Sequence, residues 1–313
     1  MSLLHCKIGS VLLNNPVIMA SGTFGFGQEY ARLYDVSVLG GIAGKGLTLH
    51  PRSGNSGCRL QETAAGMLNS VGLENPGISH FLHHELEQMA ALGPCVIANL
   101  GGANCEEYVE GARLIGEDSK GRTLTGKRGI EMIELNISCP NVKEGGIQFG
   151  VDTEMACPIV RAVRDVTHLP LMVKLSPNAQ DIVRMAQMCE QEGADAVSLI
   201  NTFSAMKIDI HRRRSAFDNL YAGLSGPAIK PIALRMVHQV AQAVHIPVIG
   251  MGGITSVEDI IEFIMAGAQA VQIGTHNFTH LRAGEALVQG LEQWLRRQGI
   301  DSLEEIRGII SCV

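Results

Sequence analysis

Eight short, continuous apolar runs constrain the fold of this chain more than any other feature of its sequence. They cover residues 17–20, 38–43, 96–100, 132–137, 171–175, 196–200, 248–251 and 270–273. Strands that are buried on both faces read as continuous apolar segments, whereas strands with one solvated face alternate between apolar and polar residues. Most of the runs are separated by segments with helical periodicity. The pattern therefore predicts parallel strands that are joined by crossover helices.

Eight strand–helix units in 313 residues favour an α/β fold of the (β/α)8 TIM barrel type, with one domain over residues 1–313. A doubly wound open sheet would give a similar alternation and stays open as the alternative. The chemistry of the residues that follow the runs favours the barrel. Residues 3–17 contain a Gly9-Ser10 turn between two short apolar runs. We expect them to form an N-terminal β-hairpin that closes the bottom of the barrel.

Two segments carry signals for the start and end of a helix. Asn178 is expected to cap a helix that has Asp181 in its first turn and stops at Gly193. Ser256 and Asp259 are expected to begin a second helix in the same way, and Gly267 is expected to end it.

Three connections, at residues 48–82, 139–153 and 203–227, are too long to be simple turns. Each follows the carboxyl end of an expected strand. In a barrel these ends form the catalytic face. We therefore expect the three insertions to lie over an active site.

Composition excludes several classes of function. A formal net charge of −6 offers no basic surface for nucleic acid. The eight cysteines include no CxxC pair, so no structural metal site is expected. We expect the thiols to be reduced, as in a cytoplasm. The N-terminus lacks a signal-peptide pattern, and no apolar run approaches the roughly 20 residues of a membrane span. We expect a soluble cytoplasmic protein that acts on small molecules.

Two glycine motifs near the C-terminus point to a phosphate site. Gly252-Gly253 follows the seventh run, and Gly274-Thr275 follows the eighth. Glycines let backbone amides approach an anion closely, and the helix expected at Ser256 adds the positive end of its dipole. Ordinary strand-to-helix turns are the alternative for either motif alone.

Two lysines end apolar runs, Lys45 after the second and Lys174 at the fifth. A buried ammonium group is unfavourable unless an anion or an electron-rich ring compensates it. Both lysines are therefore expected to serve function, although a single lysine at a barrel rim more often reaches into water.

Four asparagines lie near strand ends or in the first insertion: Asn69, Asn99, Asn136 and Asn201, the last followed by Thr202. A single asparagine is most often a cap or a turn residue. Several together would suit a polar heterocycle, because each carboxamide both donates and accepts hydrogen bonds.

Cys139 is the strongest candidate for a reactive group. Most cysteines in proteins are buried and structural, but this one follows a strand and precedes the Gly145-Gly146 pair. Its thiol could act as a general base if its surroundings lower its pKa from about 8.5. A cysteine–histidine nucleophile pair stays open, although no histidine motif marks a partner. Residues 212–214, three arginines, are expected to be solvated loop charge.

Taken in order, these motifs resemble the dihydroorotate dehydrogenases over nearly the whole chain. They are residues 19–25, Lys45-Gly46, residues 69–73, residues 136–141, Asn201-Thr202, residues 224–229 and the paired glycines. Cysteine at the base position is similar to the class 1 enzymes, and the Lys143 to Gly146 continuation is similar to the class 1B catalytic subunit. The sequence has His276 where a small residue is expected.

The resemblance implies an FMN-dependent barrel that oxidises dihydroorotate to orotate in pyrimidine synthesis. Cys139 would remove the C5 proton while hydride passes from C6 to flavin N5, and Lys45 and Lys174 would stabilise negative charge. The implied FMN site comprises Ser21, Lys45, Gly46, Asn99, Asn136, Lys174, Ile200, Gly226, Gly252, Gly253, Gly274 and Thr275. The implied substrate site comprises Lys45, Asn69, Ser70, Val71, Gly72, Leu73, Asn136, Asn201 and Thr202.

Class 1B further implies a homodimer that joins a second subunit with FAD and a [2Fe–2S] cluster, in a heterotetramer that reduces NAD. A class 1A enzyme that uses fumarate and a flavin barrel similar to dihydropyrimidine dehydrogenase are the alternatives. A non-redox isomerase or synthase barrel that binds a substrate phosphate is a more distant one.

Overall fold

The computed structural model describes residues 3–137 and 152–311, and it contains a closed barrel of eight parallel strands. Strand β16 pairs with β3 and so closes the barrel, which excludes the open sheet. The strands are β3 (Val17–Met19), β4 (Gly41–Ala43), β7 (Cys95–Leu100), β8 (Met132–Asn136), β9 (Leu171–Lys174), β10 (Ala196–Leu199), β15 (Val248–Met251) and β16 (Ala270–Ile273). Each of the eight apolar runs overlaps a barrel strand, and the prediction of a (β/α)8 barrel is confirmed.

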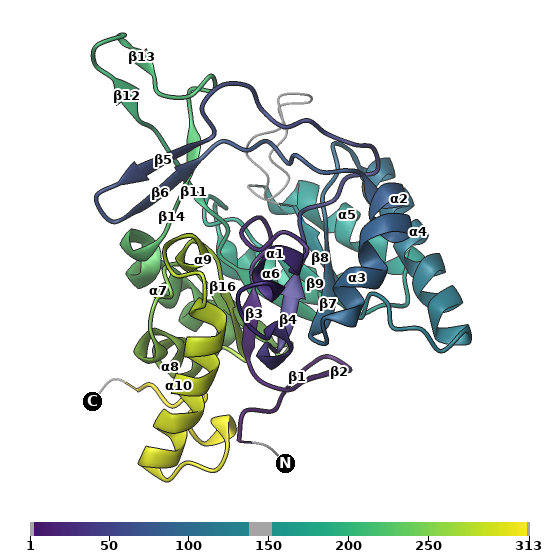
Figure 1. Cartoon of the computed structure of the whole chain (residues 1–313), viewed down its shortest axis with the longest axis vertical. Helices are drawn as coiled ribbons and strands as arrows, with labels where there is room; N and C mark the ends of the chain where they lie inside the picture. Colours follow the sequence, from purple (N-terminus) through teal and green to yellow (C-terminus); the bar gives the residue numbers. More distant parts are fainter. Residues whose placement is uncertain (1–2, 138–151, 312–313) are drawn as a thin grey trace.

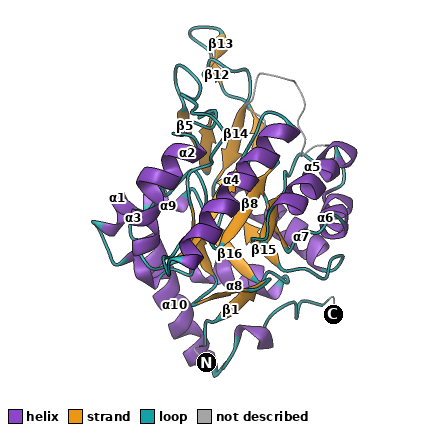
Figure 2. Cartoon of the chain, turned by 90° about the vertical axis from the view of Figure 1, so that its right-hand side faces the viewer, coloured by secondary structure: helices purple, strands orange, loops and turns teal. Residues whose placement is uncertain are grey.

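Helices cover the outside of the barrel (Figures 1 and 2). They are α1 (Gln28–Ala31), α2 (Ile78–His80), α3 (Leu86–Ala91), α4 (Cys105–Leu124), α5 (Thr153–Val166), α6 (Ile182–Gln191), α7 (Lys230–Ala241), α8 (Val257–Met265), α9 (His276–Thr279) and α10 (Ala283–Gln298). A π-helical turn, η2 (Phe81–Glu85), joins α2 to α3, and 3₁₀ turns lie at η1 (Val36–Val38), η3 (Pro227–Ile229) and η4 (Leu303–Glu305). In the part of the chain that the structure describes, no helix combines the length and apolar character needed to cross a bilayer.

An N-terminal hairpin closes the end of the barrel opposite the site (Figure 1). Strands β1 (Cys6–Ile8) and β2 (Val11–Leu13) pair antiparallel around Gly9, whose φ of 57° suits a tight turn. Ile8 and Leu13 are fully buried against inward-pointing residues of the barrel, among them Ile97, Met132, Met172, Ala196 and Ile249. The predicted hairpin and its place at the bottom are confirmed.

Side chains alternate between the inside and the outside of the barrel along each strand. In β8, Ile133 and Leu135 pack outward with the helices, whereas Met132 lies in the inner cluster above the hairpin. Glu134 has the same parity as Met132 and therefore points inward. Next to the apolar inner layer, towards the carboxyl ends of the strands, lies a layer of buried polar residues: Asn99, Glu134, Lys174, Ser198 and Gln272.

A separate four-stranded antiparallel sheet lies over the carboxyl end of the barrel; we call it the roof sheet (Figure 1). Strands β5 (Leu60–Thr63) and β6 (Gly66–Asn69) come from the first insertion, and β11 (Phe203–Ala205) and β14 (Ala222–Ser225) come from the third. Gly223 pairs with Asn69 and Ser225 with Met67, so two distant insertions form one cover. The second insertion, residues 139–153, lies mostly outside the described residues.

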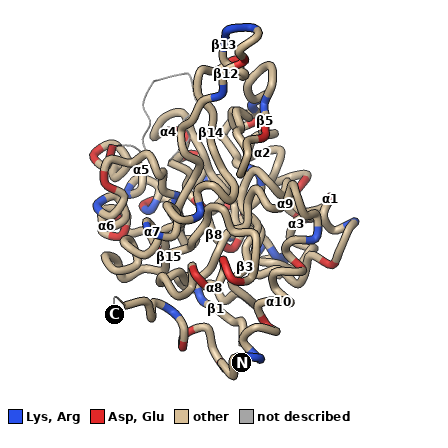
Figure 3. Tube along the Cα trace, turned by 90° about the vertical axis from the view of Figure 1, so that its left-hand side faces the viewer, with Lys and Arg blue, Asp and Glu red and all other residues tan. Residues whose placement is uncertain are grey.

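A short hairpin of β12 (Ile208–Asp209) and β13 (Arg214–Ser215) extends from the roof sheet. Its tip carries the exposed arginines 212–214, a blue segment of the trace that Figure 3 shows away from the barrel. The prediction that this charge is solvated is confirmed.

One predicted helix cap is wrong and one is confirmed. Asp181, and not Asn178, caps α6, because its carboxylate accepts the backbone N–H groups of Val183 and Arg184. Asn178 lies outside the helix, where its side chain contacts the loop after β10. Ser256 and Asp259 form the expected capping box of α8.

Candidate active site

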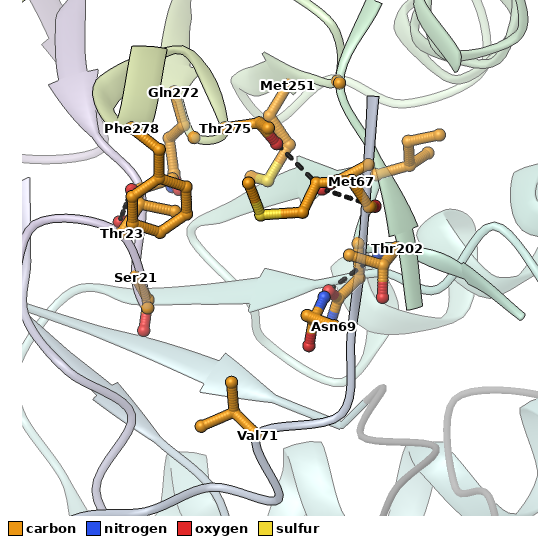
Figure 4. Close-up of a pocket in the computed structure, with 18 of the residues that line it drawn as sticks. Ser21, Thr23, Met67, Asn69, Val71, Thr202, Met251, Gln272, Thr275 and Phe278 are labelled. Carbon is orange, nitrogen blue, oxygen red and sulfur yellow. Dashed lines mark hydrogen bonds between the residues drawn. The ribbon is translucent and has the colours of Figure 1, made fainter. Parts of the chain in front are cut away.

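A cavity of about 430 Å³ lies between the carboxyl ends of the barrel strands and the roof sheet (Figure 4). Barrel residues form its floor and sides, and the roof strands β6 and β14 contribute Met67, Asn69 and Ser225. A cavity at this end of a barrel is where enzymes of this fold bind their substrates.

Lys174 provides a buried positive charge at the cavity floor. It ends β9 and is only 5% exposed, and its Nζ atom lies 4.0 Å from Oε2 of Glu134, which is fully buried. Glu134 also accepts hydrogen bonds from Asn99 Nδ2 (2.6 Å), Gln272 Nε2 (2.6 Å) and Ser198 Oγ (2.8 Å). A buried carboxylate is tolerated when donors surround it in this way.

Lys45 supplies a second cation at the rim. It follows β4 and is half-buried, and its ammonium group lies 3.8 Å from Glu74. Glu74 is also bound by Arg59 at 2.8 Å, so it is shared between two cations. Solvent weakens this rim pair, and Lys45 can turn to an anion in the cavity at little cost.

Carboxamides line the sides of the cavity. Asn201 donates from Nδ2 to Oδ1 of Asn136 over 3.4 Å, and its own Oδ1 accepts the backbone N–H of Thr202 at 2.8 Å. Asn69 donates to the carbonyl of Gly223 in the roof sheet. Figure 4 places Asn69 and Thr202 on the side of the cavity away from Ser21.

The segment of residues 69–73 leaves the roof sheet and runs along the cavity. Gly72 and Leu73 both have positive φ, at 77° and 55°. Asn75 holds this turn, because its Nδ2 donates to the Leu73 carbonyl at 2.7 Å and its Oδ1 accepts the Thr48 and Gly77 amides. The side chain of Ser70 is buried and accepts from Asn55 and Asn219, so it braces the roof and does not line the cavity.

Glycines form a cradle at the other end of the cavity. Gly252 and Gly253 have φ angles of 124° and 76°, and a Cβ on Gly253 would lie 2.8 Å from Lys230 Cβ. Only glycine fits there without strain, which leaves the backbone open to a ligand. Opposite them, Thr275 donates from its hydroxyl to Ser225 Oγ at 2.8 Å.

His276 lies at the same end of the cavity. Burial lowers the pKa of its imidazole, and the neighbouring His280 lowers it further, against a smaller opposing effect of Asp259. The ring is therefore mostly uncharged at neutral pH.

Comparison with known proteins then assigns a family. A model of the family described as dihydroorotate dehydrogenase matches residues 3–295. The chain belongs to the dihydroorotate dehydrogenase family. It is 52% identical over 304 residues to a Petrotoga mobilis protein named dihydroorotate dehydrogenase B (NAD(+)), catalytic subunit. The matched residues cover 97% of this chain and 98% of the relative.

Two further relatives carry the same name. The one from Caldicellulosiruptor saccharolyticus is 48% identical, with 98% of this chain and 99% of the relative covered. The one from Listeria monocytogenes is 47% identical, with 98% of each chain covered. The family and enzyme class expected from the sequence motifs are confirmed.

The structure brings most of the predicted site residues to this one cavity of a dihydroorotate dehydrogenase family member. The cavity is lined by Ser21, Lys45, Gly46, Asn69, Val71, Gly72, Leu73, Asn136, Lys174, Ile200, Asn201, Thr202, Gly226, Gly252, Gly253, Gly274 and Thr275. Asn99 lies beneath the floor and Ser70 behind the wall. Cys139 lies outside the described residues. The roles assigned to all of these residues stay predictions.

Several residues at the site were missed from the sequence. Glu134, Ser198 and Gln272 lie within apolar runs, and their parity with other inward residues was the available signal. Asn75 carried no signal beyond being one more asparagine in an insertion. Met67 and Met251 line the cavity without a motif of their own.

A flavin, which the family implies, fits the residues of this site. Asn99 Oδ1 and Gln272 Oε1 are buried acceptors without a hydrogen-bond partner among the described residues. The glycine cradle lies at one end of the cavity and Lys174 at its floor. Within residues 3–137 and 152–311 no group of histidine, cysteine or acidic side chains could hold a metal ion.

Asp259 holds the loop that carries the cradle. Its Oδ2 atom accepts the Thr255 and Ser256 amides and the Thr255 hydroxyl, and its Oδ1 accepts from Lys230 Nζ at 2.6 Å. Burial pushes the pKa of Asp259 upward, but the hydrogen bonds from Lys230 and Thr255 outweigh that effect. The pKa therefore lies below its ordinary value.

Asp259→Asn is expected to lower the free energy of unfolding by about 2 kcal/mol at neutral pH, since one ion pair and part of a helix cap are lost. Because the folded-state pKa is depressed, this contribution is present above about pH 4 and is lost as pH falls through the folded pKa. Urea unfolding between pH 7 and pH 3 measures it. Asp181→Asn at the exposed cap of α6 is the control and should cost only a few tenths of a kcal/mol, because asparagine caps a helix about as well as aspartate. A difference between wild type and Asp259→Asn that persists unchanged at pH 3 would contradict this account.

Proposed function

We propose that this chain is an FMN-dependent catalytic subunit that oxidises (S)-dihydroorotate to orotate in de novo pyrimidine biosynthesis. Residues 1–313 would form one FMN-binding barrel domain. The observation that carries the proposal is the meeting of two cations, Lys45 and Lys174, with the carboxamides of Asn136 and Asn201 in one cavity of a dihydroorotate dehydrogenase family member. A carboxylate-bearing pyrimidine and an electron-accepting ring both suit such a lining.

FMN would supply the hydride acceptor, N5 of its ring. The backbone amides at Gly252, Gly253, Gly274 and Thr275 are suited to hold its phosphate, as glycine-rich loops at helix N-termini do. Ser21, Gly46, Asn99, Asn136, Ile200 and Gly226 complete the proposed FMN site. Lys174, buried at the floor, would stabilise negative charge on the flavin ring.

Residues of the barrel and of the roof sheet would hold the substrate. Asn69, residues 71–73, Asn136, Asn201 and Thr202 would offer donors and acceptors for the pyrimidine, and Lys45 would offer its ammonium group to the carboxylate; Ser70 would hold residues 69–73 in place from behind. Cys139 would take the C5 proton as hydride leaves C6. Asn136, three residues before Cys139 in the sequence, ends β8 and lines the cavity, which supports this role.

The electrons would leave through a partner protein. The three relatives are named as NAD(+)-type catalytic subunits, which supports a separate partner subunit here. We propose that a homodimer of this chain binds a subunit with FAD and a [2Fe–2S] cluster, in the cytoplasm. No observation favours fumarate or a dihydropyrimidine without a carboxylate.

The purified chain is expected to be yellow, and anaerobic addition of dihydroorotate is expected to bleach its flavin absorbance. Dihydrouracil should fail to do so, because it lacks the carboxylate that Lys45 would bind. Bleaching by dihydrouracil but not by dihydroorotate would overturn the substrate. A colourless protein that cannot be reconstituted with FMN would instead support a non-redox barrel.

Copurification from the native source tests the partner. We expect a second subunit with about one FAD and two irons per copy, and NAD reduction only when it is present. Turnover by the isolated chain with fumarate would overturn the NAD-linked assignment and leave the oxidation of dihydroorotate intact.

A further inference from the structure

We propose that Glu134 is a positioning residue that sets the direction of the amides and the net charge at the cavity floor. This inference rests on the proposed function, because the ligand above the floor is taken to be the flavin. It also makes Gln272 a further binding residue, whose side-chain carbonyl receives an N–H or O–H group of the ligand.

Glu134 connects five strands of the barrel through one carboxylate. Asn99 comes from β7, Lys174 from β9, Ser198 from β10 and Gln272 from β16, while Glu134 itself lies in β8. Asn99 donates to Oε2, and Ser198 and Gln272 both donate to Oε1. With Lys174 4.0 Å from Oε2, both oxygens face donors, which is the arrangement that an ionised carboxylate requires.

The carboxylate decides which end of each amide faces the ligand. Because it only accepts hydrogen bonds, Asn99 and Gln272 must turn their NH2 groups towards it. Their carbonyl oxygens then point away, and neither has a partner among the described residues. Gln272 lines the cavity, and Asn99 Oδ1 lies 3.0 Å from the position of a Cβ on Gly46, which also lines it. The floor thus holds, next to the cavity, two buried acceptors that no described residue satisfies.

The same carboxylate offsets the charge of Lys174. The ammonium group is almost fully buried, so little solvent screens it from a ring above. With Glu134 ionised the floor is close to neutral, and without it the floor carries a full positive charge. The positive charge of Lys174 stabilises the electron-rich reduced flavin and so raises its reduction potential. Because Glu134 offsets that charge, we infer that it keeps the flavin potential low.

The test measures the reduction potential and the dissociation constant of FMN in Glu134→Gln. We expect the reduction equilibrium to shift about tenfold towards reduced flavin, which corresponds to about 30 mV for a two-electron couple. FMN affinity should fall as well. A glutamine at position 134 can donate a hydrogen bond, so the side-chain amide of Asn99 or Gln272 can turn its carbonyl oxygen towards it and away from the ligand. An unchanged or lower potential in protein that binds FMN would overturn the proposal.

Two further variants keep the test decisive if Glu134→Gln fails to fold. Gln272→Met removes one donor from the carboxylate, which leaves its negative charge less compensated, so the flavin potential should fall. The variant also removes one acceptor next to the cavity, so FMN affinity should drop about fivefold. Ser198→Ala removes a donor from the same carboxylate but no acceptor from the cavity, so the potential should fall slightly and FMN affinity should stay unchanged. An equal loss of FMN affinity in Gln272→Met and Ser198→Ala would indicate general loosening and would overturn the proposal. If wild-type protein binds no FMN at all, the proposed function fails instead.

Discussion

Lys174→Met is expected to destabilise the folded protein by about 3 kcal/mol and to remove most of its ability to hold reduced flavin. Methionine fills the space of the lysine stem, so the change is mainly one of charge. It leaves the carboxylate of Glu134, which is fully buried, without its cation. Urea unfolding of the FMN-free protein measures the first effect, and FMN titration with the flavin potential measures the second.

The double variant Lys174→Met with Glu134→Gln separates the two effects. Removal of both charges takes away the unpaired buried carboxylate, so most of the stability should return. The ability to stabilise reduced flavin should not return, because the ammonium group is still absent. A double variant that is as unstable as Lys174→Met would show that the pair is not coupled. Near-normal flavin affinity and reduction in Lys174→Met would reduce Lys174 to a packing role.

The barrel could be predicted because its strands are buried on both faces. That burial produces continuous apolar runs, and eight runs with intervening helices leave few folds to consider. The strand predicted at residues 38–43 was the least accurate. Only Gly41–Ala43 is strand, and a 3₁₀ turn, η1, occupies Val36–Val38. Apolar residues pack well in either conformation, so hydrophobicity alone does not separate them.

The polar layer inside the barrel was harder to predict. Glu134 lies within an apolar run, and the run reads as buried strand with or without it. Its partners Ser198 and Gln272 lie about 60 to 140 residues away, and only closure of the barrel brings them to it. The roof sheet depends on contacts over similar distances, since β6 pairs with β14. The local sequence pattern does not indicate which distant residues will pair.

Asn178 shows how local rules fail next to a site. Both Asn178 and Asp181 are good helix caps, and the pattern alone could not choose between them. The structure assigns the cap to Asp181, whereas Asn178 binds the Thr202 carbonyl in the loop after β10 and the Ser204 amide in β11. The side chain of Asn178 is thus engaged by residues that are distant in sequence and does not cap α6.

The cysteines of the described residues do not compete with Cys139 for the role of base. Burial raises the pKa of the Cys95 and Cys189 thiols, and it raises that of Cys6 to about 12. Cys58 is exposed just before β5, and none of the six described cysteines, which also include Cys105 and Cys157, lines the cavity. A thiol base for the proposed reaction must therefore come from outside them, which leaves Cys139 as the candidate that the sequence motif names.

Cys139→Ser is expected to slow flavin reduction by dihydroorotate by about 10² to 10⁴ fold at neutral pH, because a hydroxyl is a far weaker base than a thiolate. FMN should stay bound, since the proposed FMN site does not include this residue. Anaerobic stopped-flow measurement of the flavin absorbance gives the rate. The wild-type rate should rise with pH through the pKa of the thiol, and the variant should lose that rise. Cys58→Ser makes the same chemical change just before β5 and should leave the rate unaltered. A Cys139→Ser rate near that of wild type would remove the thiol from proton transfer and return the choice of base to the other polar groups of the cavity.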